Sequence, residues 1–197
     1  MRSLKGRGWL AALAAPVLLA GCGVNTIPTD EEKAKAAWAD VQADYQRRAD
    51  LVPNLVATVQ GYAQQEREVL TRVTEARARV GSIQATPELL NNPDAFQQFQ
   101  KAQGELSGAL SRLLVVAEQY PQLKSDQNFR DLQAQLEGTE NRIAVERMRF
   151  NEAAQAFNTR RLSFPTTIVA GFFGSRFNEK AYFKAVSGAE TPPKVHF

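Results

Sequence analysis

The chain has little of the chemistry from which most enzyme active sites are built. Its 197 residues include one cysteine, Cys22, and one histidine, His196, which stands one residue from the end. Zinc sites, Cys/His nucleophiles and the Glu-x-x-His pairs of di-metal helical bundles all need more such side chains. There is also no glycine-rich phosphate-binding loop. We therefore predict no catalytic residue, no metal site and no cofactor.

The chain also lacks an excess of charge beyond its first residues. Its formal net charge is +3, but Arg2, Lys5 and Arg7 precede Cys22 and no acidic residue does. Because these are three of the 24 basic residues, the remainder carries 21 basic and 21 acidic side chains. Nucleic-acid binding depends on clustered Lys and Arg that neutralise phosphates. The neutral body therefore argues against a nucleic-acid partner.

No apolar run is long enough to favour a permanent membrane-spanning helix. The cationic start MRSLKGRG is followed by eleven mostly apolar residues that end at Leu19, and then by Ala20, Gly21 and Cys22. Eleven helical residues span about 17 Å, whereas the hydrocarbon core of a bilayer is about 30 Å thick. A cationic start, a short apolar run and small residues are together typical of a secretory signal peptide. We predict a signal peptide over residues 1–21.

The stretch from Leu19 to Cys22 resembles the lipobox of bacterial lipoproteins, in which the cysteine is acylated and becomes the first mature residue. We predict cleavage between Gly21 and Cys22 and lipidation of Cys22; the alternative is a buried free thiol. Each buried CH₂ contributes about 0.8 kcal/mol, so more than one acyl chain gives stable membrane attachment. By resemblance to Gram-negative sorting, Gly23 after the cysteine favours the outer membrane, facing the periplasm. Residues 22–29 are expected to be a lipidated tether.

From residue 30 onward the apolar residues are spaced as in amphipathic helices. A capping-box pattern at Thr29–Glu32 predicts a helix start. A seam of residues three and four apart then runs from Trp38 to Val80 and keeps its phase across Pro53. We therefore predict one long helix over about 30–81, kinked at Pro53.

Two further stripes with the same spacing follow. They predict helices over 93–119 and from after Ser125 to before Pro165, with a short helical turn at 87–90. No segment shows the alternation of a strand, and the connections are short enough to require antiparallel neighbours. The predicted fold is all-α, an antiparallel bundle of three to four long amphipathic helices over residues 30–163.

Four polar residues interrupt the apolar seams and are the candidate chemical groups of the interior: Arg48, Glu66, Gln103 and Glu146. A buried carboxylate must find a partner or change its protonation state, and Arg48 is a candidate partner for one of the other three. These residues either fix the register of the bundle or lie at its edge, or they form a catalytic site. Glu137, Glu140 and Arg142 form a dense charge cluster that is typical of pairing along a helix surface.

The last part of the chain, residues 164–197, is rich in aromatic residues. Its aromatics either close one end of the bundle or form an exposed patch for a partner or a membrane interface. The candidate interaction patch consists of Phe172, Phe173, Arg176, Phe177, Tyr182 and Phe183.

Three blocks of the sequence carry a family resemblance. Residues 37–77, which contain RRADLVPNLV and TEAR, resemble the LemA family, and so do YPQLKS at 120–125 and LEGTENRIAVERMRFNEAAQAFN at 136–158. The resemblance implies an all-α, antiparallel-helix domain that is attached to a membrane by its N-terminus. It implies no activity and no catalytic residue. The lipobox departs from many relatives, which look as though they begin with an ordinary transmembrane helix.

Two hypotheses for function follow from these observations. The first is a non-catalytic scaffold or interaction protein of the bacterial cell envelope, lipid-anchored and bound to envelope proteins whose identity the sequence does not give. The second is an envelope hydrolase or ligand-binding protein that uses seam carboxylates such as Glu66 and Glu146. Heptad seams serve both intramolecular packing and self-association, so they leave the oligomeric state open.

Overall fold

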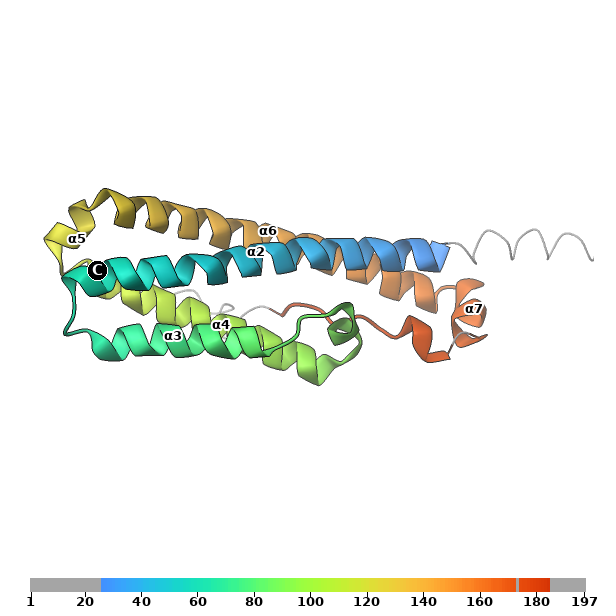
Figure 1. Cartoon of the computed structure of the whole chain (residues 1–197). Helices are drawn as coiled ribbons and strands as arrows, with labels where there is room; N and C mark the ends of the chain where they lie inside the picture. The colour runs from blue at the N-terminus through green and yellow to red at the C-terminus, as the bar shows by residue number, and fades with distance from the viewer. Residues whose placement is uncertain (1–25, 173, 185–197) are drawn as a thin grey trace, which may run out of the picture.

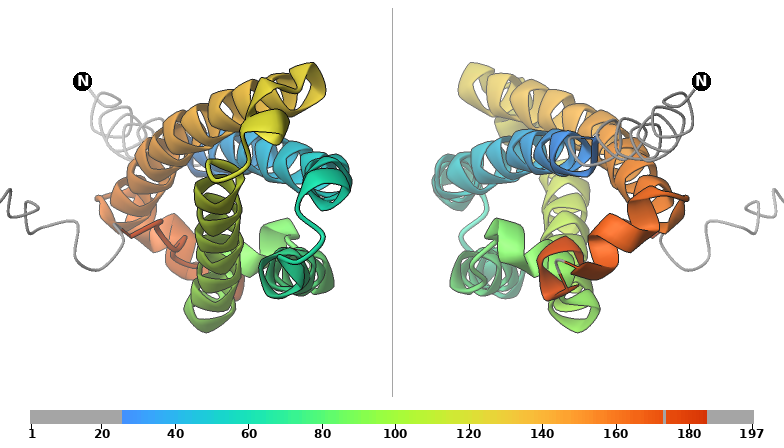
Figure 2. Two further views of the ribbon diagram at one scale, coloured as in Figure 1. Left: turned by 90° about the vertical axis from the view of Figure 1, so that its left-hand side faces the viewer. Right: turned by 90° about the vertical axis from the view of Figure 1, so that its right-hand side faces the viewer.

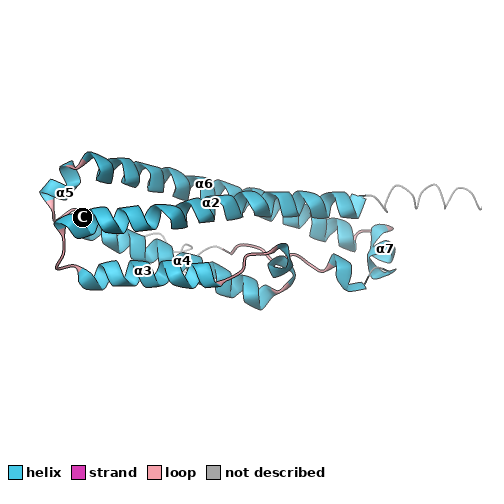
Figure 3. Cartoon of the chain, in the orientation of Figure 1, coloured by secondary structure: helices cyan, strands magenta, loops and turns pink. Residues whose placement is uncertain are grey.

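The computed structural model describes residues 26–172 and 174–184, and within these residues the chain is helical and contains no strand (Figures 1 and 3). The elements are α2 (Thr26–Tyr62), α3 (Arg67–Ser82), η1 (Pro87–Asn91), α4 (Pro93–Ala117), α5 (Pro121–Ser125), α6 (Gln127–Leu162), α7 (Thr166–Phe172) and η2 (Gly174–Phe177). The predicted all-α bundle is confirmed. Among the described residues, no helix has a stretch that is long and apolar enough to cross a bilayer.

The long helices form an elongated bundle of two antiparallel pairs, α2 with α6 and α3 with α4 (Figures 1 and 2). Polar contacts fix the register of the first pair along its whole length: Asp30 with Arg160, Asp44 with Arg142, Arg48 with Glu140 and Tyr62 with Asp126. The α2–α3 turn and α5 lie at one end, and α7 lies at the other end beside the start of α2 (Figure 1).

The core consists of three clusters along the bundle axis. The first lies towards the α2–α3 turn and includes Leu55, Leu106 and Leu113. The second is an aromatic cluster around Trp38, whose ring lies 5.4–6.0 Å from four phenylalanine rings. The third is at the α7 end and contains Ile27, Phe157, Ala170 and Phe177. Each cluster contains residues of α2 and α6, so this pair contributes to the core along the whole bundle.

The prediction of a single helix over 30–81 is wrong, because the chain reverses direction at residues 63–66. Ala63, the first residue of the reversal, and Leu70, after it, both bury their side chains in the same cluster. The seam therefore keeps its apparent phase although it belongs to two helices. A reversal lets the apolar face of α3 pack against α4 and α2, whereas a continuous helix would leave it exposed to water.

Helix α2 is described from Thr26 onward, so the chain is already helical one turn before the predicted start near residue 30. Ile27 is fully buried in the cluster with Phe157, and this contact holds the additional turn on α6. The predicted tether over 22–29 is therefore too long, because residues 26–29 belong to α2.

Pro53 lies inside α2, and the helix continues past it to Tyr62. A proline has no N–H, so the carbonyl of Ala49 loses its helical partner. Arg77 of α3 replaces that partner, since its Nε donates to the Ala49 carbonyl over 2.9 Å. An unpaired buried carbonyl is thereby avoided, and the proline site also ties α3 to α2.

The segment after η2 packs along the bundle. Phe183 is only 6% exposed and lies in the Trp38 cluster. Its backbone is held by Asn151, whose side chain accepts from the Phe183 N–H and donates to the Phe183 carbonyl, both over 2.9 Å. Asn158 makes the same pair of contacts with the Lys180 backbone, also over 2.9 Å. Two asparagines of α6 thus fix this irregular segment, together with the Leu90 carbonyl of η1, which accepts from the Ala181 N–H over 3.0 Å.

Candidate functional site: polar networks of the bundle and the groove beside them

The most buried charged group that the structure describes is the Arg48 guanidinium on α2, which is 1% exposed. Its Nη1 donates to Glu140 Oε1 of α6 over 2.9 Å and to Ser107 Oγ of α4 over 2.5 Å. Its Nη2 donates to the backbone carbonyl and side-chain oxygen of Gln103. The guanidinium carbon lies 5.1 Å from the centre of the Tyr45 ring. One arginine therefore connects three helices.

The sequence analysis predicts that Arg48 pairs with one of the other three polar seam residues. The structure shows that this partner is Gln103. Glu140, in contrast, belongs to the cluster that was interpreted as pairing along a helix surface. That interpretation is wrong for Glu140 and Arg142, because both reach across to α2, Arg142 through Asp44 at 3.1 Å. Since α2 and α6 pack along their full length, charges at their shared edges face each other.

A second network lies near the start of α2. Lys180 is almost completely buried, and its Nζ donates to Glu31 Oε1 over 3.0 Å and to Asn91 Oδ1 over 2.8 Å. The same ammonium lies 4.9 Å from the centre of the Phe157 ring. This network joins the C-terminal segment to α2 and η1, so its charges are used for packing contacts.

A groove of about 620 Å³ lies beside the Arg48 network, where α2, α3 and α4 diverge. Small residues of α2 and α3 line much of it, including Ala39, Ala43 and Ala78. Tyr45, Phe99 and Gln103 also line it. Burial raises the pKa of Tyr45, while the nearby Arg147 and Arg48 partly oppose the rise, so its hydroxyl is neutral at physiological pH. The described residues that line the groove include no Ser, Thr, Cys or Lys and no carboxylate.

The predicted carboxylates Glu66 and Glu146 are not brought together. Glu66 lies at the α2–α3 turn and accepts from the Tyr120 hydroxyl over 2.9 Å. Glu146 lies in the middle of α6 and accepts from Arg149 over 2.6 Å. Glu66 lies near the end of the bundle where Tyr62 contacts Asp126, and Glu146 is about twenty helical residues further along α6. At 1.5 Å per residue, the two carboxylates are therefore about 30 Å apart along the bundle axis. The two carboxylates therefore cannot act on one small substrate.

The polar contacts described above join helices to one another. A model described as the LemA family matches residues 37–197. The chain belongs to the LemA family. This finding confirms the resemblance seen in the sequence.

Relatives of this LemA-family chain come from several bacteria. The magnetosome protein MamQ of Magnetospirillum gryphiswaldense is 27% identical over 184 residues, covering 85% of this chain and 67% of the relative. Magnetosome protein MamQ 1 of Paramagnetospirillum magneticum shows the same values. Protein LemA of Metamycoplasma hominis is 23% identical over 146 residues, covering 74% of this chain and 63% of the relative. None of these names states a reaction or a substrate.

The residues of the predicted interaction patch have different surroundings in this LemA-family bundle. Phe177 and Phe183 are buried in the core and are not available to a partner at the surface. Tyr182 is half-buried, and its hydroxyl accepts from Asn158 over 2.7 Å. Phe173 and the side chains of Phe172 and Arg176 lie outside the described residues. Gly21, Cys22 and His196 also lie outside them.

The sequence analysis missed the partners that complete the networks, which are Ser107, Glu31, Asn158 and Lys180. Spacing did not mark Asn158 and Lys180 as interior groups, because the first lies at the edge of a stripe and the second in a segment without periodicity. A search for metal sites finds no group of three or more His, Cys, Asp or Glu side chains that could hold an ion within the described ranges.

Proposed function

We propose that this LemA-family chain is a lipoprotein of the bacterial cell envelope that acts as a non-catalytic scaffold for other envelope proteins. The proposal is supported by the observation that the buried charged groups make contacts between elements of the bundle. The guanidinium of Arg48 and the ammonium of Lys180 both link helices to one another. When the buried charges hold the helices together, the outer surfaces of the bundle keep a fixed shape. Surfaces of fixed shape are suited to binding partner proteins.

Membrane attachment is proposed to occur through acylated Cys22 after removal of residues 1–21. Three residues separate Cys22 from Thr26, the first residue of α2. Four extended Cα–Cα steps reach at most about 14 Å. The bundle would therefore be held within this distance of the lipid surface, and Gly23 favours the outer membrane with the bundle in the periplasm.

The proposal is tested by in-cell crosslinking followed by mass spectrometry, with wild type compared with Cys22→Ser. We expect wild type to fractionate with membranes and to capture a small, reproducible set of envelope proteins. We expect Cys22→Ser to remain unprocessed and to lose this set. Capture of only abundant neighbours, in proportion to their abundance, would count against a scaffold role.

One observation favours the second hypothesis, a hydrolase or ligand-binding protein. Glu146 Oε2 is buried and has no hydrogen-bond partner among the described residues, so it is an acceptor that the packing of the bundle does not use. Glu146→Gln keeps the shape of the side chain but removes its charge, and Glu66→Gln serves as the second variant. Loss of the cellular phenotype in a variant that folds normally and keeps its crosslinked partners would support this hypothesis over the scaffold.

A further inference from the structure

Three large apolar side chains are exposed where α6 passes into α7. Leu162 is 69% exposed, Phe164 is 82% exposed and Ile168 is 53% exposed. We call these three residues the α6–α7 corner. Isolated apolar residues are common on protein surfaces, but three within seven residues at one corner are a concentrated apolar contact.

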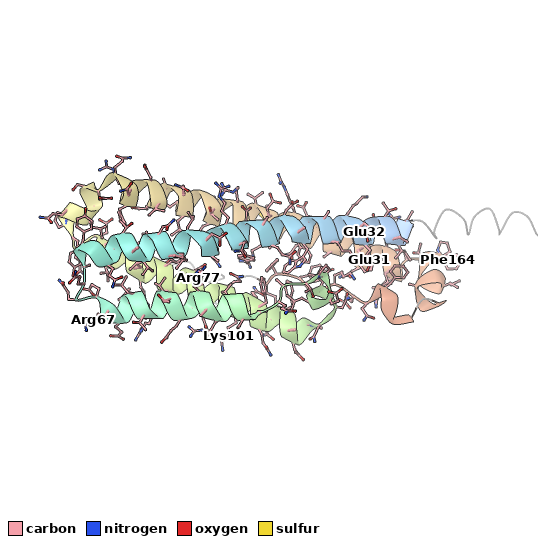
Figure 4. The ribbon with its side chains drawn as sticks, in the orientation of Figure 1. Glu31, Glu32, Arg67, Arg77, Lys101 and Phe164 are labelled. Atoms are coloured by element: carbon pink, nitrogen blue, oxygen red, sulfur yellow. The ribbon has the colours of Figure 1, made fainter. Side chains whose placement is uncertain are left out.

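The corner lies at the end of the bundle where α2 begins. Figure 4 labels Phe164 beyond Glu31 and Glu32, at the opposite end from Arg67. Contacts agree with this view, because Ile27 shares a core cluster with Phe157 and Ala170, which flank the corner in sequence. The first turn of α2 and the corner therefore form one end face.

The length of the chain before α2 indicates what this end face meets. If Cys22 is acylated at the bilayer surface, the start of α2 lies no more than about 14 Å from it. The corner shares the end face with that start. A short tether thus keeps the exposed apolar side chains next to lipid.

We infer that the α6–α7 corner inserts Leu162, Phe164 and Ile168 into the boundary between headgroups and acyl chains, so that the bundle stands end-on upon the membrane. The inference rests on the proposed lipid attachment and adds a second, protein-side contact with the bilayer. Leu and Phe side chains are typical of the buried face of interfacial segments.

Charges of both signs lie beside the corner, including Arg160 and Arg161 in the last turn of α6. Asp30 accepts from Lys33 and from Arg160, both over 3.2 Å. Glu31 and Glu32 add negative charge at the same end, and Lys35 lies 2.8 Å from Glu32. A bilayer of zwitterionic phosphatidylcholine therefore tests the apolar insertion by itself, without attraction between basic residues such as Arg161 and anionic lipid.

The single cysteine of the sequence allows this insertion to be tested by site-specific labelling. Cys22 is the only cysteine, and acylation blocks its thiol, so a new cysteine is the sole site for an environment-sensitive fluorophore. Thr167→Cys places the label on α7 beside the corner, and Gln65→Cys places it in the α2–α3 turn at the other end; both residues are exposed. The acylated chain is reconstituted in phosphatidylcholine vesicles with a nitroxide quencher on the acyl chains.

We expect the label at position 167 to be quenched at least threefold more than the label at position 65. Phe164→Asp combined with Ile168→Asp should abolish this difference while the protein still floats with the vesicles. The matched control combines Val115→Asp with Met148→Asp, which are exposed apolar residues outside the corner, and should leave the quenching unchanged. Equal urea midpoints of the variants would show that folding is intact.

The outcomes separate the two proposals. A protein that floats with equal quenching at both positions overturns the insertion and leaves lipid attachment standing. A chain that does not float overturns both. Crosslinking of position 167 to a protein in cells, without quenching in vesicles, would overturn the lipid contact and assign the corner to a protein partner.

Discussion

At the scale of single residues, Arg48 is the group that binds α2, α4 and α6 together. Arg48→Ala removes the partner of Glu140 and leaves the buried Gln103 side chain without its donor. Loss of one member of a buried pair costs about 3–5 kcal/mol. Glu140 is 38% exposed and can regain water, so we expect a loss of about 2–3 kcal/mol in the free energy of unfolding.

Urea denaturation measures this loss, and Glu140→Gln is the matched control. Because glutamine can still accept from Arg48, we expect it to cost about 1 kcal/mol or less. An Arg48→Ala variant as stable as wild type would contradict the structural role assigned to the guanidinium.

Pro53 and Arg77 are coupled through the carbonyl of Ala49. Arg77→Met leaves this carbonyl without a donor and should lower the free energy of unfolding by about 1–2 kcal/mol. In a Pro53→Ala background, the new N–H of residue 53 can take the carbonyl, so Arg77→Met should cost clearly less. A double-mutant cycle measures this coupling, and additive effects would show that the two sites are independent.

Asp126 makes the start of α6 sensitive to acid. The Phe129 N–H and the Tyr62 hydroxyl both donate to its carboxylate and lower its pKa. An unfolded Asp has a pKa of about 3.9, so this stabilisation is present above that pH and is lost as the pH falls through the lower folded value.

Asp126→Asn keeps a good N-cap but cannot titrate in this range. We therefore expect the urea midpoint of wild type to fall more than that of Asp126→Asn between about pH 6 and about pH 2.5. Parallel curves for the two proteins would show that Asp126 carries no acid-sensitive stabilisation.

At the scale of elements, the C-terminal segment is part of the core. Phe183 contacts Trp38, Tyr45, Phe96 and Phe150 in one aromatic cluster. Phe183→Ala should lower the free energy of unfolding by about 3–4 kcal/mol because it removes a buried ring. Phe164→Ala makes the same chemical change at an 82% exposed position and should change the free energy in solution by less than about 0.5 kcal/mol.

Trp38 reports both unfolding reactions, since the other tryptophan, Trp9, lies in the predicted signal peptide. Similar urea midpoints for Phe183→Ala and Phe164→Ala would contradict the packing of the segment after η2 and would leave its aromatics available as a surface patch.

The elements that the sequence predicted best have strong stripes and clear ends. The boundary at Pro93 was predicted because Asn92 and the proline are typical of a helix start, and the Asn92 side chain does accept from the Ala95 N–H. The reversal at residues 63–66 was missed because no proline marks it. Both flanking helices face one core, so periodicity alone could not separate them.

The candidate site was less predictable than the helices. Arg48 and Gln103 interrupt apolar stripes and could be found by spacing, whereas Ser107 and Glu140 lie beside the stripes of other helices. Their contact with Arg48 depends on how α4 and α6 pack against α2, and a single sequence does not contain that arrangement. The polar anchors of the C-terminal segment, Asn151 and Asn158, depend on packing in the same way.

At the scale of the whole molecule, the described residues form an elongated bundle whose two ends differ (Figure 1). One end carries the turn at residues 63–66 and the Tyr62–Asp126 contact. The other carries the first turn of α2 and the exposed α6–α7 corner (Figure 4). A lipid on Cys22 would place the second end at the membrane and direct the first end away from it, towards envelope partners.

The central claim, attachment through Cys22, is tested most directly by the intact mass of the protein extracted from cell membranes, followed by sequencing of its N-terminal peptide. We predict a mature chain that begins at Cys22 and carries the added mass of its acyl chains. A chain that retains residues 1–21 and a thiol that reacts with maleimide would contradict the account.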